Sequence, residues 1–218
     1  QDYKRAIILG SKQTFGKGTV QNVIDLNRII SGSTHGDLGA VKLTTDKFYR
    51  INGGSTQLEG VKSDIVVKNQ YSYIEMGEKD QENPLEWDSI EPAPYQQWQG
   101  QINYDYAISQ SAERLKDHPY IQLVDQQARR IEAQQDDYTY TLNFDDYLKE
   151  LELNKKMNDK FSVLKDYRSE LTFEWIPEPG ALNDEVIEER KKRWFEVLEQ
   201  DFYIDEAVNI LEDLNINL

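Results

Sequence analysis

The chain contains 218 residues, enough for one large domain or two small ones, with 25 Lys and Arg against 40 Asp and Glu. Because the formal net charge is −15, we expect no nucleic-acid partner, since phosphate backbones are bound by clusters of Lys and Arg. Cysteine is absent and there are only two histidines, which argues against disulfides, thiolate zinc sites and multi-histidine metal sites. We therefore expect no metal and no cofactor, and no apolar run is long enough for a membrane span.

The net charge and the pattern of residue types both change near residue 68. Residues 1–68 hold 10 Lys and Arg against 6 Asp and Glu, a net of +4, whereas residues 69–218 carry a net of −19. The first part has short β-branched runs separated by glycines, which predict strands joined by tight turns. The expected strands are Ala6–Leu9, Thr19–Leu26, Val41–Thr45 and Val61–Val67. The first of them is apolar throughout and is expected to be buried on both faces.

The remainder of the chain changes to a helical period. Residues 69–100, which contain prolines and tryptophans, are expected to form a linker, and residues 101–218 a mostly α-helical domain. Asn143 is expected to cap one helix and Asn183 to begin another. The apolar sets expected on the inner helix faces are Tyr104, Ile108, Ala112 and Leu115; Ile121, Val124, Ala128 and Ile131; Tyr147, Leu148, Leu151, Met157, Phe161 and Leu164; Ile187, Trp194, Val197 and Leu198; and Ile204, Ala207, Val208, Leu211 and Leu214. The predicted fold class is α+β, a β-rich part followed by a helical one.

One segment, Thr14–Gln21, carries residues suited to chemistry, because Lys17 stands between two glycines. A phosphate-binding loop would need four residues between its glycines and a Ser or Thr after the lysine. Here five residues separate Gly10 from Gly16, and Gly18 follows the lysine, so both requirements fail. An exposed turn lysine without catalytic function and a catalytic lysine remain as alternatives.

A lysine acts as a general base only when its amine is neutral, which requires a pKa lowered by desolvation. In an extended strand Lys17, Thr19 and Gln21 point to the same face. A straight strand would separate Lys17 from Gln21 by about 13 Å, so a bend at Gly18 or the reach of both side chains must close the gap. A neutral amide suits this position, since it can orient the amine without stabilising its charged form as a carboxylate would.

The segment Thr14–Gln21 resembles the lysine motif of the carboxyl-terminal processing proteases, serine endopeptidases that use a Ser-Lys dyad. Three further strings, Lys47–Gln57, Asn83–Ile90 and Asp205–Ile210, are similar to the tail-specific branch of that family. The resemblance implies that residues 1–68 are the C-terminal part of a protease catalytic core and that residues 101–218 are an acidic helical C-terminal domain. It is specific at the lysine motif and looser over residues 100–200.

Carried over by position, the resemblance makes Lys17 the general base, Gln21 the residue that positions it, and Asp2 a supporting acidic residue. In the family the nucleophilic serine and the substrate-tail-binding PDZ domain lie upstream of the lysine by more than this chain extends. The resemblance therefore implies that this chain alone is inactive. Two departures from the family pattern are an extra residue in the Ser11–Gln13 turn and Ser63 in place of the usual proline.

Serines within the chain are the alternative nucleophiles, although each has a simpler explanation as a turn residue. They are Ser11, Ser31, Ser33 and Ser55. The two histidines are expected to be structural, His35 in a glycine-rich turn and His118 at a helix boundary before Pro119.

The resemblance implies protein or peptide substrates with accessible C-terminal tails, a protein adaptor as a further partner, and a location in the bacterial cell envelope, in the periplasm. The rival hypothesis is a noncatalytic helical module that binds an adaptor or another partner and keeps the lysine motif as a relic.

Overall fold

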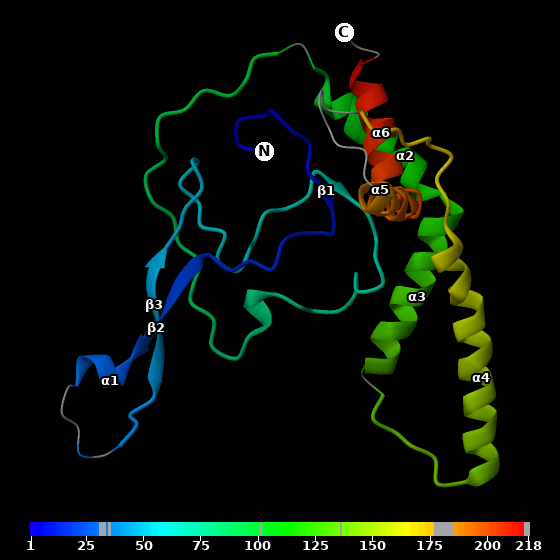
Figure 1. The fold of residues 1–218 in the computed structure, drawn as a ribbon, viewed down its shortest axis with the longest axis horizontal. Coiled ribbons are helices and arrows are strands. Elements are labelled where there is room, and N and C mark those ends of the chain that lie inside the picture. Colours follow the sequence, from blue (N-terminus) through cyan, green and yellow to red (C-terminus); the bar gives the residue numbers. More distant parts are fainter. Residues whose placement is uncertain (31–33, 35, 101, 136, 177–184, 216–218) are drawn as a thin grey trace. The chain divides into compact units, whose positions relative to one another are not determined.

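A computed structural model describes the chain except for residues 31–33, 35, 101, 136, 177–184 and 216–218. The described residues form two compact units. Unit 1 comprises Gln1–Ile8, Gln13–Ser63 and Glu75–Gln99, and unit 2 comprises Leu9–Lys12, Asp64–Ile74 and Gly100–Leu218. A strand-containing part precedes a mostly helical one along the chain, which confirms the predicted α+β class (Figure 1).

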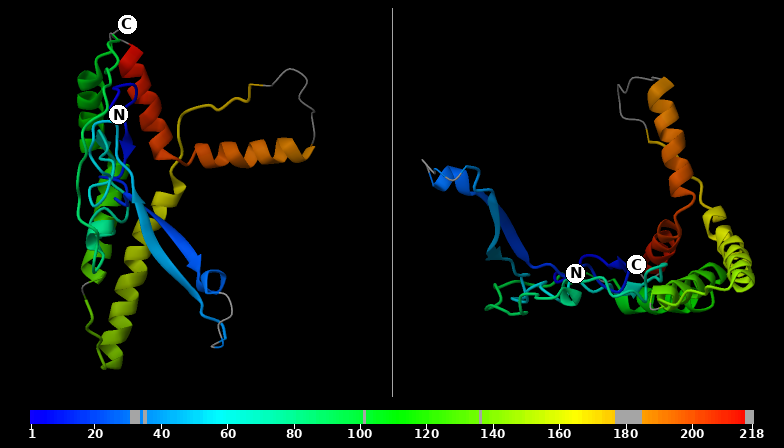
Figure 2. Two further views of the ribbon diagram at one scale, coloured as in Figure 1. Left: turned by 90° about the vertical axis from the view of Figure 1, so that its left-hand side faces the viewer. Right: turned by 90° about the horizontal axis from the view of Figure 1, so that it is seen from below.

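Unit 1 is built around an antiparallel hairpin of β2, Thr19–Asp25, and β3, Ala40–Lys47. The strands β2 and β3 form a twisted two-stranded ribbon (Figure 2). The short helix α1, Leu26–Ile29, follows β2. The register shifts after Val20, so that Thr45 is an extra residue in β3. Both predicted strands in this region are confirmed. The only helical turn in the rest of the described unit is η1, Glu78–Asp80.

Unit 2 contains a two-residue parallel pair, β1, Leu9–Gly10, with β4, Ile65–Val66. The prediction of a buried strand over Ala6–Leu9 was wrong, since β1 begins at Leu9 and that residue is only half-buried. The physical reason is that β1 has a single partner in the described part of the chain. Parallel strands become fully buried only where layers cover both faces.

The helices of unit 2 lie where the period predicted them. They are α2, Tyr104–Lys116; α3, Pro119–Gln135; α4, Phe144–Ser162, continued by η2, Val163–Asp166; α5, Glu185–Leu198; and α6, Phe202–Asn215. The Asn143 side chain accepts hydrogen bonds from the backbone N–H groups of Asp145 and Asp146, which confirms it as the N-cap of α4. The predicted boundary at His118 is also confirmed, while Asn183 lies outside the described residues.

The inner face of α3 was predicted correctly, but those of α2 and α6 are rotated. α3 buries Ile121, Val124 and Ala128. α2 instead buries Ala107, Ser111 and Leu115, and α6 buries Phe202, Glu206, Ile210 and Asp213. The two helices lie side by side (Figure 1), so the acidic groups of α6 are turned inward.

The rotation follows from an ion-pair cluster between α2 and α6. Arg114 donates two hydrogen bonds to one oxygen of Glu206, from Nη2 at 2.8 Å and Nε at 3.2 Å, and one from Nη1 to Asp213 at 2.7 Å. Glu206 is only 3% exposed. Buried carboxylates are tolerated when they are paired and hydrogen-bonded, so the charged positions lie inside the helix pair.

Two predicted inner faces are exposed in large part, although Phe161, which belongs to the set predicted for α4, is buried. On α4, Tyr147, Leu148 and Leu151 are exposed, and on α5 the same holds for Ile187, Trp194 and Val197. Helical period shows which side chains share a face, but burial depends on whether another element covers that face. Among the described residues α5 has no fully buried side chain. In the described part of the chain, no helix combines the length and the apolar character needed to cross a bilayer.

Candidate functional site

The structure brings together two of the predicted site residues. Lys17 Nζ donates a hydrogen bond to Gln21 Oε1 at 2.9 Å, across the four-residue spacing at the start of β2. Gln21 Nε2 also makes a long contact of 3.5 Å with Thr44 Oγ1 on β3. Both ends of the Gln21 amide therefore have partners, and the amide oxygen faces the lysine amine.

The glycines beside Lys17 are required by close backbone approach. Gly16 has φ +89°, a conformation that favours glycine, and a Cβ there would lie 3.0 Å from the Leu58 carbonyl. A Cβ on Gly18 would lie 2.5 Å from the backbone nitrogen of Gln57 and 2.7 Å from Ser55 Oγ. Neither glycine accepts a side chain without displacement of the segment packed against it.

That segment, Thr56–Leu58, forms a hydrogen bond to each residue of Gly16–Gly18. We call Thr56–Leu58 the clamp and Gly16–Gly18 the lysine loop. The Leu58 N–H donates to the Gly16 carbonyl at 2.7 Å, and Thr56 Oγ1 donates to the Lys17 carbonyl at 3.2 Å. The Gly18 N–H donates to Gln57 Oε1 at 2.9 Å. Three consecutive residues of the loop are thus held by three consecutive residues of the clamp.

Sequence reasoning did not identify the clamp as part of the site. The signal was present, because the string Lys47–Gln57 carried much of the family resemblance, but it did not show which loop that string contacts. The pairing joins residues 39 positions apart along the chain, and only the folded chain reveals it.

Asp2 lies in an ion pair with Arg50. Arg50 Nη2 and Nε donate to the two oxygens of Asp2 at 2.6 and 2.8 Å, and Asn52 Nδ2 donates to Asp2 Oδ1 at 3.1 Å. Both partners of the pair are mostly buried, with the Asp2 side chain 17% exposed. Asp2 therefore ties the first residues of the chain to the turn that leads into the clamp.

The serines considered as alternative nucleophiles lie in different environments. Ser55 is buried, its Oγ accepts from the Gln57 N–H at 3.1 Å and donates to the Phe48 carbonyl at 3.4 Å, and it serves the turn. Ser11 is exposed and belongs to unit 2. Ser31 and Ser33 lie outside the described residues, as does His35.

The lysine loop presents an exposed amine beside a neutral amide. No ion pair holds Lys17 within the described part of the chain, so its oriented partner is the Gln21 amide. Such an arrangement can accept a proton from a hydroxyl placed next to the amine, provided that the face is covered and desolvated. Over the described residues, no group of three His, Cys, Asp or Glu side chains could hold a metal ion.

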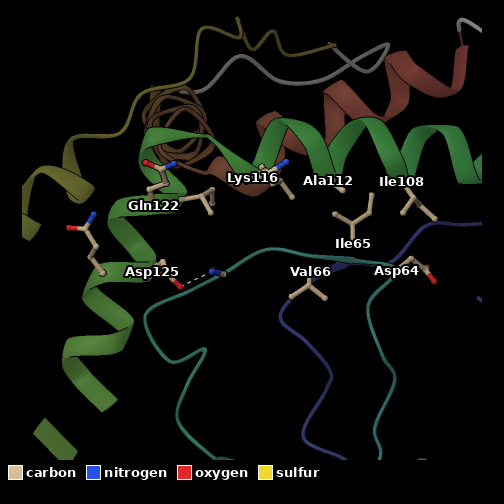
Figure 3. Close-up of a pocket in the computed structure, with 12 residues that line it drawn as sticks. Asp64, Ile65, Val66, Ile108, Ala112, Lys116, Gln122 and Asp125 are labelled. Atoms are coloured by element: carbon tan, nitrogen blue, oxygen red, sulfur yellow. Dashed lines mark hydrogen bonds and ion pairs between the residues drawn. The ribbon is translucent and has the colours of Figure 1, made fainter. Parts of the chain in front are cut away.

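A separate hollow of about 670 Å³ lies within unit 2, between β4 and the helices α2 and α3 (Figure 3). Ile65 points toward Ile108 and Ala112, and Lys116 and Asp125 stand on the rim. The apolar face predicted to be the inner face of α2 thus borders this hollow. None of the residues predicted for catalysis lines it.

Asp125, on the rim of that hollow, is the centre of a polar cluster. It accepts hydrogen bonds from Lys68 Nζ at 2.7 Å, from Arg129 Nε at 3.0 Å and from the Tyr73 hydroxyl. Burial alone would raise the pKa of Asp125, but these hydrogen bonds, that from Lys68 first, outweigh it and lower the pKa to about 2. The cluster attaches residues 68–73 to α3.

Comparisons with known proteins bear on both parts of the chain. Peptidase family S41 matches residues 1–67, and the family described as the C-terminal domain of tail specific protease matches residues 71–215. The chain is 47% identical over 110 residues, half of its length, to the tail-specific protease of Haemophilus influenzae. It is 44% identical over 68 residues, 31% of its length, to the carboxy-terminal-processing protease of Bartonella bacilliformis. These matches span only 15% and 13% of the two relatives.

Proposed function

The chain belongs to the tail-specific, or carboxyl-terminal processing, protease family, and from this premise we propose that Lys17 is the general base of a Ser-Lys dyad. The serine of the dyad lies upstream of Gln1 in the parent protein. The observation that carries the proposal is the 2.9 Å hydrogen bond from Lys17 Nζ to Gln21 Oε1 in a loop that the clamp holds in place.

In this mechanism the serine hydroxyl attacks the scissile carbonyl while Lys17 takes its proton. Upstream backbone N–H groups stabilise the oxyanion, and the lysine then gives the proton to the leaving amine. Gln21 holds the amine in place, and Asp2 supports the turn before the clamp. The face that exposes Lys17 is covered by the remaining protease core and by the substrate, which supplies the desolvation.

The substrates are proteins with accessible C-terminal tails, and the setting is the bacterial envelope, in the periplasm. The names of the two relatives support the substrate class, since both refer to carboxyl-terminal ends or tails. The acidic helical domain shapes access to the core or holds a protein adaptor. The 218-residue chain by itself, which lacks the nucleophile, does not cleave peptides.

The test is a peptide-cleavage assay with the full-length parent protein. Lys17→Ala should lower kcat by about 10²- to 10⁴-fold, the typical contribution of a positioned general base. Lys62→Ala is the matched control, since Lys62 is an exposed lysine of the same unit that pairs with Glu59. Near-normal activity of the Lys17 variant with an unchanged melting temperature would contradict the proposal and favour the noncatalytic module. Cleavage by the isolated chain would place the nucleophile among its own serines.

A further inference from the structure

We infer that Gln57 is a positioning residue for Lys17, an amide that sets the direction of the lysine side chain from behind the loop. The inference rests on the proposed function and deepens it. Gln57 is fully buried, at 0% exposure, so its side chain does not reach solvent. It therefore acts through Lys17 and takes no part in the bond-making steps itself.

Every hydrogen-bonding group of the Gln57 side chain is in use. Oε1 accepts from the Gly18 N–H at 2.9 Å, and Nε2 donates to the Leu85 carbonyl at 3.0 Å and to Glu78 Oε1 at 3.3 Å. A side-chain amide offers one acceptor oxygen and two N–H donors, so this set fixes its orientation. The N–H of Gly18 needs an acceptor and the carbonyl of Leu85 needs a donor, which excludes the flipped amide.

The hydrogen bond from Gly18 to Gln57 is made by the peptide unit that joins Lys17 to Gly18. That unit is planar, and its two polar ends are both held, the Lys17 carbonyl by Thr56 Oγ1 at 3.2 Å and the Gly18 N–H by Gln57. The neighbouring peptide units are held as well, since the Leu58 N–H donates to the Gly16 carbonyl at 2.7 Å and the Phe48 N–H donates to the Gly18 carbonyl at 3.0 Å. With the peptide planes on both sides of Lys17 held, the Cα–Cβ direction of Lys17 is set, and its amine lies 2.9 Å from Gln21 Oε1.

The same amide links the lysine loop to residues 78–85, which the sequence predicted to be part of a linker. In the structure these residues belong to unit 1 and supply two of the three partners of Gln57. The lysine is thus positioned in part by chain that follows the S41-like segment. Gln57 and its partners Glu78 and Leu85 were not identified from sequence as part of the site.

The experiment measures kcat and KM for the full-length parent carrying Gln57→Met. Methionine keeps the length of the side chain but cannot accept the Gly18 hydrogen bond as the amide does. A misplacement of about 1 Å in a catalytic group can cost about 10²-fold, so kcat should fall about 10- to 100-fold while KM stays within about twofold. Val67→Ala, at a buried site in unit 2, is the control for general destabilisation and should leave kcat unchanged at temperatures below its unfolding.

A double variant separates positioning from a merely structural role. In the Lys17→Ala background, Gln57→Met should not lower the residual rate further, because its effect passes through the lysine. A further loss of about tenfold, a wild-type kcat for Gln57→Met, or an equal loss of kcat for Val67→Ala would each overturn the inference. If Gln57→Met does not fold, Thr56→Val removes the neighbouring donor at a less buried position and is held to the same criteria. Near-normal activity of Lys17→Ala alone would instead overturn the proposed function.

Discussion

The two units of the chain maintain their structures by different means. Within the described residues, every buried apolar side chain belongs to unit 2. In unit 1 the buried side chains are polar, Thr19, Ser55 and Gln57, and several glycines are buried beside them. Unit 1 therefore depends on backbone and amide hydrogen bonds, whereas unit 2 combines an apolar core with the Arg114 and Asp125 clusters.

The difference has an energetic consequence. An intramolecular hydrogen bond contributes about 1 kcal/mol net, whereas burying a Val, Leu, Ile or Phe side chain contributes roughly 1.5–3 kcal/mol. We expect unit 2 to carry most of the stability of the chain and unit 1 to gain stability when its exposed faces are covered. The loop around Lys17, which is held by hydrogen bonds rather than by an apolar core, fits this expectation, since its geometry is set by directional contacts.

The largest loss of stability is expected when the ion-pair cluster between α2 and α6 is broken. Arg114→Met removes the cation that pairs with Glu206 and Asp213 between α2 and α6, and should lower the free energy of unfolding by about 3 kcal/mol. Urea denaturation followed by circular dichroism measures it. Arg193→Met, which removes an exposed pair with Glu189 on α5, should change stability by less than about 0.5 kcal/mol. Equal effects of the two variants would show that the cluster is not needed to join α2 and α6.

The Asp125 cluster should give unit 2 a stability that depends on pH. Its folded pKa, about 2, lies below the unfolded value of about 3.9, so the contribution is present above pH 4 and is lost as the pH falls toward 2. Asp125→Asn should therefore cost about 2 kcal/mol at pH 7 and little near pH 2. Urea denaturation at several pH values checks this, with Asp159→Asn, at an exposed position of α4, as the control. A cost that does not change with pH would contradict the assignment.

Hydrogen exchange should distinguish the units directly. Backbone amides of β2 and β3 should exchange at least about tenfold faster than those in the buried turns of α3 and α6, because local opening follows the density of apolar contacts. The measurement is mass spectrometry of the intact chain after pulse labelling. Equal protection in both units would mean that the hydrogen bonds of unit 1 suffice without an apolar core.

The smallest effect is expected at the start of α4, where the apolar face is exposed and the helix depends on its own cap. Asn143→Ala removes the acceptor for the N–H groups of Asp145 and Asp146 and should cost about 1 kcal/mol. Exchange of the first-turn amides measures the loss locally. Asn143→Asp keeps a capping oxygen and should retain the protection. If the alanine variant retains it as well, packing rather than the cap holds this end of the helix.

The amino-acid sequence by itself determined the local features of this protein. Turn residues and β-branched runs predicted β2 and β3, and period with capping residues predicted α2 to α6 and the cap at Asn143. The lysine motif was identified by its resemblance to the family, while the four-residue spacing of Lys17 and Gln21 showed only that the two side chains could meet. Each of these features depends on neighbours in the chain.

Only the tertiary structure decided what covers each face and what holds the lysine loop. The apolar faces of α4 and α5 could be predicted from the sequence, but they are exposed in large part. The inner faces of α2 and α6 include the charged residues Arg114, Glu206 and Asp213. The Gln57 amide accepts a hydrogen bond from Gly18, which lies 39 positions away in the chain. The physical reason is that period and spacing describe one element at a time. Burial and hydrogen bonding, in contrast, depend on partners distant in sequence, and a charge is tolerated inside once its partner is there.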